Sequence, residues 1–150
     1  MKKIIRIIGE INEATLNNVI DVILESLHSS IISDIVILIH STCENKDVAA
    51  SIVDFLTLYP GNIITINIGA CGVCAASIFC CGNQRYMTAN SCFKVSADNL
   101  KSLSIGRFRD YQETFSCYSS YYGTNIFTYR FSSDLKFVDQ VVDSLDLLTT

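Results

Sequence analysis

Residues 34–40 form a strand-length segment in which five consecutive apolar residues stand between Asp34 and His40. This segment limits the possible folds more than any other. A strand that is apolar at every central position usually has both faces covered, as in a parallel sheet flanked by helices. Similar β-branched runs occupy residues 3–8 and 63–68. We therefore expect an α/β fold with a mostly parallel sheet built from strand–helix repeats.

The segments between these runs have the spacing of amphipathic helices. Asn12 can cap a helix whose apolar stripe runs from Leu16 to Leu27. A second stripe runs from Val48 to Tyr59, and a helix of small residues is expected from Val73 to Cys81, closed by Gly82. Short strands are expected at 85–87, 92–96 and 126–131. Apolar spacing predicts a last helix through Leu135, Val138, Val141, Val142 and Leu145.

The composition excludes several classes of protein. The chain has 150 residues, of which 49% are hydrophobic, so it can bury a core without a metal or disulfide. A net charge of −4 and the lack of a basic run argue against a nucleic-acid partner. The apolar runs are too short to span a membrane, and Arg6 and Glu10 interrupt any secretion signal. We expect a single cytoplasmic domain, residues 1–150, without a membrane partner.

Seven cysteines are many for this length, and an odd count favours reduced thiols. They are Cys43, Cys71, Cys74, Cys80, Cys81, Cys92 and Cys117. Cys71 and Cys74 form a C-x-x-C motif between a strand and a helix, which allows a thiol–disulfide oxidoreductase as one alternative. Thioredoxin-like folds place a cis-proline opposite that motif, whereas the only proline here, Pro60, precedes it. The cysteines lack paired zinc-ligand spacing, so we expect no metal and no cofactor.

Three motifs at strand ends resemble those of the ClpP-like serine peptidases, within the ClpP/crotonase fold. Residues 39–44 resemble the family's glycine-rich loop, and residues 68–82 resemble its nucleophile turn and the helix that follows. Residues 90–96 resemble the strand that ends in its catalytic histidine. The resemblance covers about residues 4–97 and, more weakly, 134–148. It implies a shortened handle segment at about 98–125 and a C-terminal helix.

The departures from the family pattern fall on its essential positions. In this resemblance the nucleophilic serine corresponds to Val73 and the catalytic histidine to Ser96, while the third triad residue has no evident counterpart. The backbone N–H groups of Glu44 and Cys74 correspond to the oxyanion hole. Valine has no nucleophilic atom, and serine is not a base at neutral pH. The resemblance therefore implies a catalytically inactive pseudo-peptidase, acting as an oligomeric scaffold, a ring partner or a binding module.

The expected partners follow from the same resemblance: a homo-oligomer, or a hetero-oligomer with a ClpP-like subunit, and possibly a peptide ligand. Activity could be restored in two ways. Cys74 could serve as a nucleophile with His40 as its base, which would make the chain a cysteine hydrolase. Ser77, in Ala75-Ala76-Ser77, mimics a nucleophile's local sequence but lies about one helical turn beyond the bend.

Overall fold

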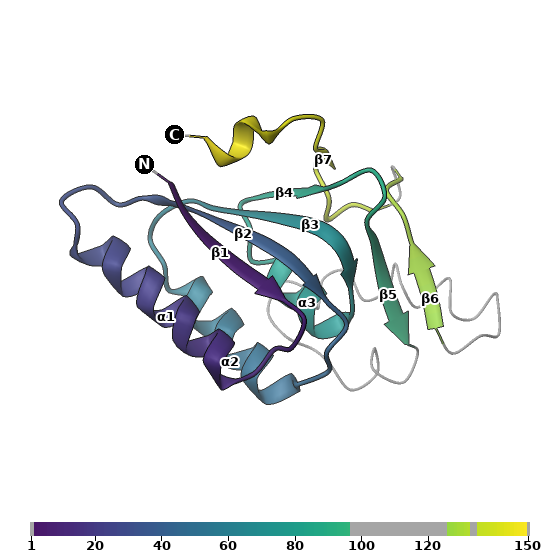
Figure 1. Ribbon diagram of the computed structural model, residues 1–150, viewed down its shortest axis with the longest axis horizontal. Helices are drawn as coiled ribbons and strands as arrows, with labels where there is room; N and C mark the ends of the chain where they lie inside the picture. The colour runs from purple at the N-terminus through teal and green to yellow at the C-terminus, as the bar shows by residue number, and fades with distance from the viewer. Residues whose placement is uncertain (1, 97–125, 133–134, 150) are drawn as a thin grey trace.

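The computed structural model describes residues 2–96, 126–132 and 135–149 (Figure 1). The first strands and helices alternate as predicted. They are β1 (Lys2–Ile8), α1 (Glu13–His28), β2 (Asp34–Ser41), α2 (Lys46–Thr57), β3 (Ile63–Cys71) and α3 (Val73–Phe79). They are followed by β4 (Gln84–Met87), β5 (Cys92–Ser96), β6 (Ile126–Tyr129), β7 (Gln140–Val141) and a 3-10 helix (Leu145–Leu148). The expected handle segment at 98–125 lies outside the described residues.

The strands form one mostly parallel sheet in the order β1-β2-β3-β4-β7. The second half of β3 pairs with β5, which in turn pairs with β6 in the antiparallel sense. Every other pairing among the described strands is parallel, which confirms the predicted βα architecture. The register between β2 and β3 shifts after Ile39, and this shift lets β3 continue to Cys71 beside Ser41.

All three helices lie on one face of the sheet, as Figure 1 shows. Their buried side chains join the inward-facing residues of β1 and β2 in the main core. The residues from the strands are Ile5, Ile7, Ile35, Ile37 and Ile39, and those from the helices include Val19, Ile23, Ile52, Val53, Leu56, Val73, Ile78 and Phe79. The residues of α1 and α2 that reach this core follow the stripe expected for helices packed on a sheet, whereas every residue of α3 is buried.

The opposite face is covered only in part, by the C-terminal segment. Its side chains Val142, Leu147 and Leu148 pack against a small second cluster of Val36, Ile64, Ile66 and Tyr86. Ile4, Ile8 and Ile68 remain exposed. The continuous apolar run of β2 thus correctly indicated a covered strand, but the cover on this side is a short segment with a 3-10 helix rather than an α-helix.

Side chains fix the helix ends locally. Asn12 caps α1 as predicted: its Oδ1 accepts from the Thr15 N–H at 3.2 Å, while the Thr15 hydroxyl accepts from the Asn12 N–H. Asn45 caps α2 by accepting from the Val48 N–H at 3.3 Å. The Thr65 hydroxyl donates to the Phe79 carbonyl at 2.6 Å and so binds the last turn of α3 to β3. Each bond satisfies a backbone group that a helix end leaves open.

The predicted C-terminal helix is wrong. In its place the chain forms β7, which pairs with β4, and a later 3-10 helix. Leu135 and Phe137 are buried in the main core, whereas Val142 and Leu147 pack on the other face of the sheet. A single helix carries one apolar stripe and cannot reach both faces, so an extended segment that crosses the sheet edge is favoured. Among the described helices, none is long and apolar enough to cross a bilayer.

Candidate active site

The carboxyl ends of β2 and β3 lie side by side, and their loops form the candidate site. The Gly72 N–H donates to the Ser41 carbonyl at 2.8 Å, which joins the turn after β3 to the end of β2. The Ser41 hydroxyl accepts from the Cys43 N–H at 3.2 Å and donates to the Gly9 carbonyl. Ligands of parallel α/β sheets bind at this edge. Ser41 therefore fixes the loops that would surround a ligand.

Val73 lies at the strand-to-helix turn, as the first residue of α3. Its side chain is fully buried in the main core, and Gly72 before it is the helix N-cap. Ser77 is also buried, and its hydroxyl donates to the Val73 carbonyl at 2.9 Å. This bond satisfies Ser77 one turn further along the helix. The structure thus places a hydrocarbon at the turn and holds the nearby hydroxyl against the helix backbone.

Cys74 and Glu44 are brought together across the turn. The Cys74 thiol donates to Glu44 Oε2 at 3.6 Å. Glu44 Oε1 lies 2.8 Å from where a Cβ on Gly72 would stand, so the carboxylate packs against this glycine. Burial raises the pKa of the Cys74 thiol to about 12, and the adjacent Glu44 carboxylate adds to the rise. A catalytic cysteine needs the opposite change, because the thiolate is the nucleophile.

The structure does not bring His40 to Cys74. His40 follows Val36 and Leu38 on the face of β2 that points away from the helices, whereas Cys74 belongs to the core on the helix side. The His40 Nδ1 accepts from the Ala70 N–H at 2.9 Å, and its ring packs over Gly69. Because Nδ1 is the acceptor, the proton of the neutral ring is on Nε2. Ser96, which the sequence resemblance pairs with a catalytic histidine, is the half-buried last residue of β5.

The two cysteines of the C-x-x-C motif have different partners. The Cys71 thiol donates to the Ile39 carbonyl at 3.8 Å, and burial raises its pKa well above the ordinary value. Both Cys71 and Cys74 are buried free thiols. Redox-active pairs have a thiol of lowered pKa, so this geometry does not favour disulfide exchange. Within the described ranges, no three His, Cys, Asp or Glu side chains are grouped as a metal site would require.

Asn67 is a site-shaping residue that the sequence reasoning missed. It is fully buried on β3, where its Nδ2 donates to the Cys92 carbonyl at 2.9 Å and its Oδ1 accepts from the Gly69 N–H at 3.0 Å. These bonds join the bend in β3 to the start of β5. The signal was present, since a polar residue inside an apolar strand must find buried partners.

The mostly parallel sheet and its strand–helix repeats define an α/β protein, in which the turn from β3 into the buried helix α3 lies beside the loop after β2. The sequence model of the Clp protease family, described as "Clp protease", matches residues 1–97. The chain therefore belongs to the Clp protease family. Comparison with curated protein sequences finds no matching relative.

Solved structures support the fold. A ClpP1 mutant from Listeria monocytogenes is 16% identical with a TM-score of 0.69, and the alignment covers 95% of this chain and 92% of the other. The ClpP protease catalytic domain from Plasmodium falciparum is 19% identical with a TM-score of 0.66, covering 94% and 85%. A peptidase from the same organism is 17% identical with a TM-score of 0.71, covering 94% and 95%. At these sequence identities the similarity shows a shared fold alone.

Proposed function

We propose that this ClpP-like chain is a pseudo-peptidase that acts by assembly, as an oligomeric scaffold, a ring partner or a binding module. The observation that carries the proposal is the buried hydrocarbon of Val73 at the turn before α3, which in the sequence resemblance corresponds to the family's nucleophile. In the same resemblance Ser96 corresponds to the family's base. Removal of either group from a Ser-His-Asp enzyme costs on the order of 10⁶ in kcat. The free thiols of Cys43, Cys71, Cys74 and Cys92 support the cytoplasmic location included in this proposal.

We expect the purified chain to release no fluorophore from peptide substrates above the background rate, and a serine-directed phosphonate to leave every serine unlabelled. Turnover would be measured by fluorescence and labelling by mass spectrometry, with an active serine peptidase as the positive control. Ser77→Ala is the matched variant, because Ser77 lies one helical turn after Val73 and its hydroxyl is bonded to the Val73 carbonyl. Phosphonate-sensitive turnover by the wild type would refute the proposal. Turnover lost in Ser77→Ala would identify the nucleophile.

Exposed apolar side chains support the assembly part of the proposal. Ile4, Ile8 and Ile68 are exposed on the open sheet face. Ile31 and Leu58 are 74% and 77% exposed. Ile31 lies in the loop before β2, and Leu58 directly follows α2. Large exposed apolar groups favour a protein interface. Exposed apolar side chains at two different places on one chain suit head-to-tail contacts between copies, and such contacts form a ring when the rotation closes.

We therefore expect light scattering to give the wild type a mass several times the 16.6 kDa of one chain. Leu58→Glu should lower this mass toward that of one chain. A buried glutamate at such a contact lacks a partner, which weakens assembly. Size-exclusion chromatography with light scattering measures the mass. Asn17→Glu, on the exposed side of α1, is the control and should leave the mass unchanged. If the wild type had the mass of a single chain at high micromolar concentration, this result would contradict self-assembly.

A further inference from the structure

We propose that Glu44 is an internal latch: its carboxylate lies over the strand-to-helix turn and accepts the hydrogen bond of the Cys74 thiol, which keeps that thiol from reacting. The latch rests on the proposed function and extends it. It explains why the thiol beside the turn does not replace the missing nucleophile. It assigns a regulatory role to the loop of residues 42–45. Movement of this loop would uncover a thiol at the turn.

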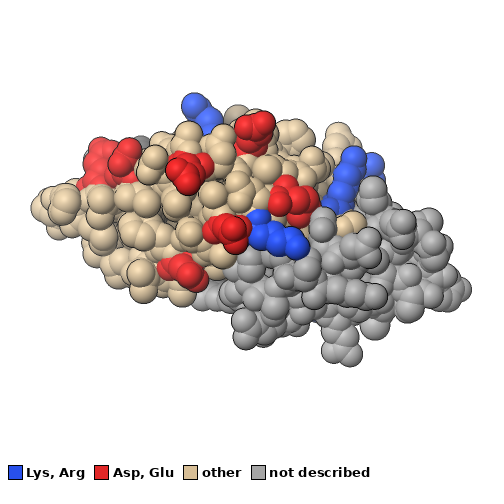
Figure 2. All heavy atoms as spheres, turned by 90° about the horizontal axis from the view of Figure 1, so that it is seen from below, with Lys and Arg blue, Asp and Glu red and all other residues tan. Residues whose placement is uncertain are grey.

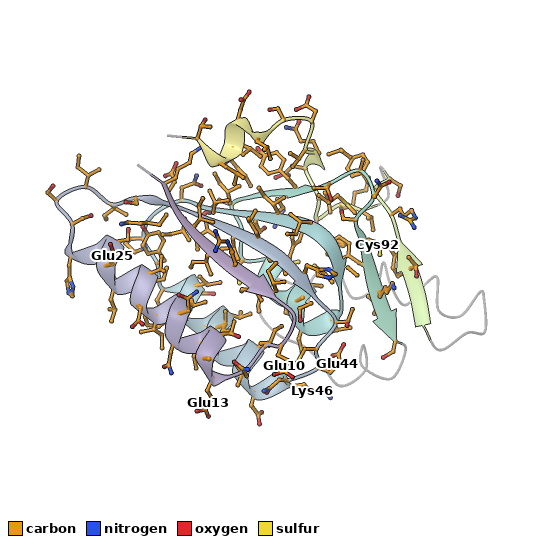
Figure 3. All side chains as sticks on the ribbon, viewed as in Figure 1. Glu10, Glu13, Glu25, Glu44, Lys46 and Cys92 are labelled. Atoms are coloured by element: carbon orange, nitrogen blue, oxygen red, sulfur yellow. The ribbon has the colours of Figure 1, made fainter. Side chains whose placement is uncertain are left out.

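The latch is held by backbone and side-chain bonds on both sides of Glu44. Before it, Cys43 donates its N–H to Ser41, which also accepts from Gly72. After it, Asn45 caps α2. The carboxylate spans from Gly72 to the Cys74 thiol, with one oxygen against each. Figure 3 shows Glu44 at the end of the sheet where this loop and α2 begin, with Lys46 beside it.

The charges around the thiol act in opposite directions. Burial is the largest cause of the raised pKa of Cys74, and Glu44 is the next, both by its charge and by accepting the thiol's hydrogen bond. Cys43 raises this pKa further, whereas Lys46 lowers it. A carboxylate that accepts from a thiol stabilises the protonated form, since ionisation would put two negative charges side by side. Removal of the Glu44 charge should therefore favour the thiolate.

The position of the carboxylate also affects what can bind. In the family resemblance the backbone N–H groups of residues 44 and 74 would face the oxygen of a bound carbonyl. With Glu44 folded over Gly72, such an oxygen would approach a negative charge. Like charges at a developing oxyanion oppose acyl transfer. Opening the latch therefore requires the loop to move or the carboxylate to be neutralised.

Alkylation by iodoacetamide tests the latch. The Cys74 thiolate attacks the reagent carbon, a sulfur–carbon bond forms, iodide leaves, and the buffer takes the thiol proton. We expect Cys74 to react slowly in the wild type and about tenfold faster in Glu44→Gln, because below its pKa a thiol reacts in proportion to its thiolate fraction. Glu44→Ala should react at least as fast, since it also removes the cover. Peptide mass spectrometry over time gives the rate for each cysteine.

Cys81 is the internal reference, because it is half-buried and bonds to the Ser77 carbonyl at the far end of α3. Glu25→Gln is the matched control, since that carboxylate lies on α1 and binds Lys3 of β1 instead. A Cys74 rate in Glu44→Gln within about twofold of the wild type would overturn the latch. An equal rise at Cys81 would also overturn it, because the change would then be general loosening. Phosphonate labelling of a serine, with these rates as expected, would instead refute only the proposed function.

Discussion

Phe93→Ala is expected to lower the free energy of unfolding by about 3–5 kcal/mol. Phe93 is fully buried on β5, with its ring edge-to-face against Phe79 and Phe137, at centroid distances of 5.1 Å to each. Phe79 ends α3, and Phe137 belongs to the C-terminal segment. The three rings therefore join the helix that begins at the candidate site to two other parts of the chain. Removing the central ring leaves a cavity beside the two remaining rings, Phe79 and Phe137.

Urea unfolding followed by circular dichroism measures this loss. Phe131→Ala is the matched control, because Phe131 has the same side chain but is 40% exposed, and its removal should cost at most about 1 kcal/mol. The slope of the unfolding free energy with urea should stay the same for both variants, since the folded state remains compact. A Phe93→Ala loss no larger than that of Phe131→Ala would show that the ring cluster is not a stabilising unit.

Local signals in the sequence predicted most of the helices and strands. The cap at Asn12 and the apolar stripes of α1 and α2 fixed both helices to within a few residues, because capping and amphipathic spacing act over one or two turns. The β-branched runs predicted β1, β2 and β3 for the same reason. The end of β3 was predicted too early, at Ile68, because Gly69, Ala70 and Cys71 have little strand propensity. Pairing with β5 and the register shift beside β2 extend the strand.

The uniform apolar run of β2 hid which residues face the helices. In an alternating strand the polar residues mark the outer face, but here Val36, Ile37, Leu38 and Ile39 are all apolar. The sequence therefore placed His40 near Cys74 by strand order alone, although His40 lies on the other face. The contact between Glu44 and Cys74 was equally hidden, because it joins residues 30 positions apart through the geometry of two loops. Only the assembled sheet edge determines such a contact.

Asn67 illustrates how a buried polar residue can shape this edge. The amide group lies inside the sheet, where it donates to Cys92 and accepts from Gly69. Its own backbone carbonyl accepts from the Thr88 N–H at 2.9 Å. Those contacts hold β3 at the bend from which the chain continues to Gly72. The bend in turn sets the direction in which the chain enters α3.

Asn67→Leu is expected to lower the free energy of unfolding by about 2–5 kcal/mol. Leucine has the same branching as asparagine but is larger and cannot hydrogen-bond, so the Gly69 N–H and the Cys92 carbonyl lose their partner in a buried place, at about 1–3 kcal/mol for each group. Urea unfolding measures the loss, and Asn17→Leu on the exposed side of α1 should stay within about 0.5 kcal/mol of the wild type. An Asn67→Leu loss below about 1 kcal/mol would mean that the two backbone groups find other partners, and that the amide does not hold the bend.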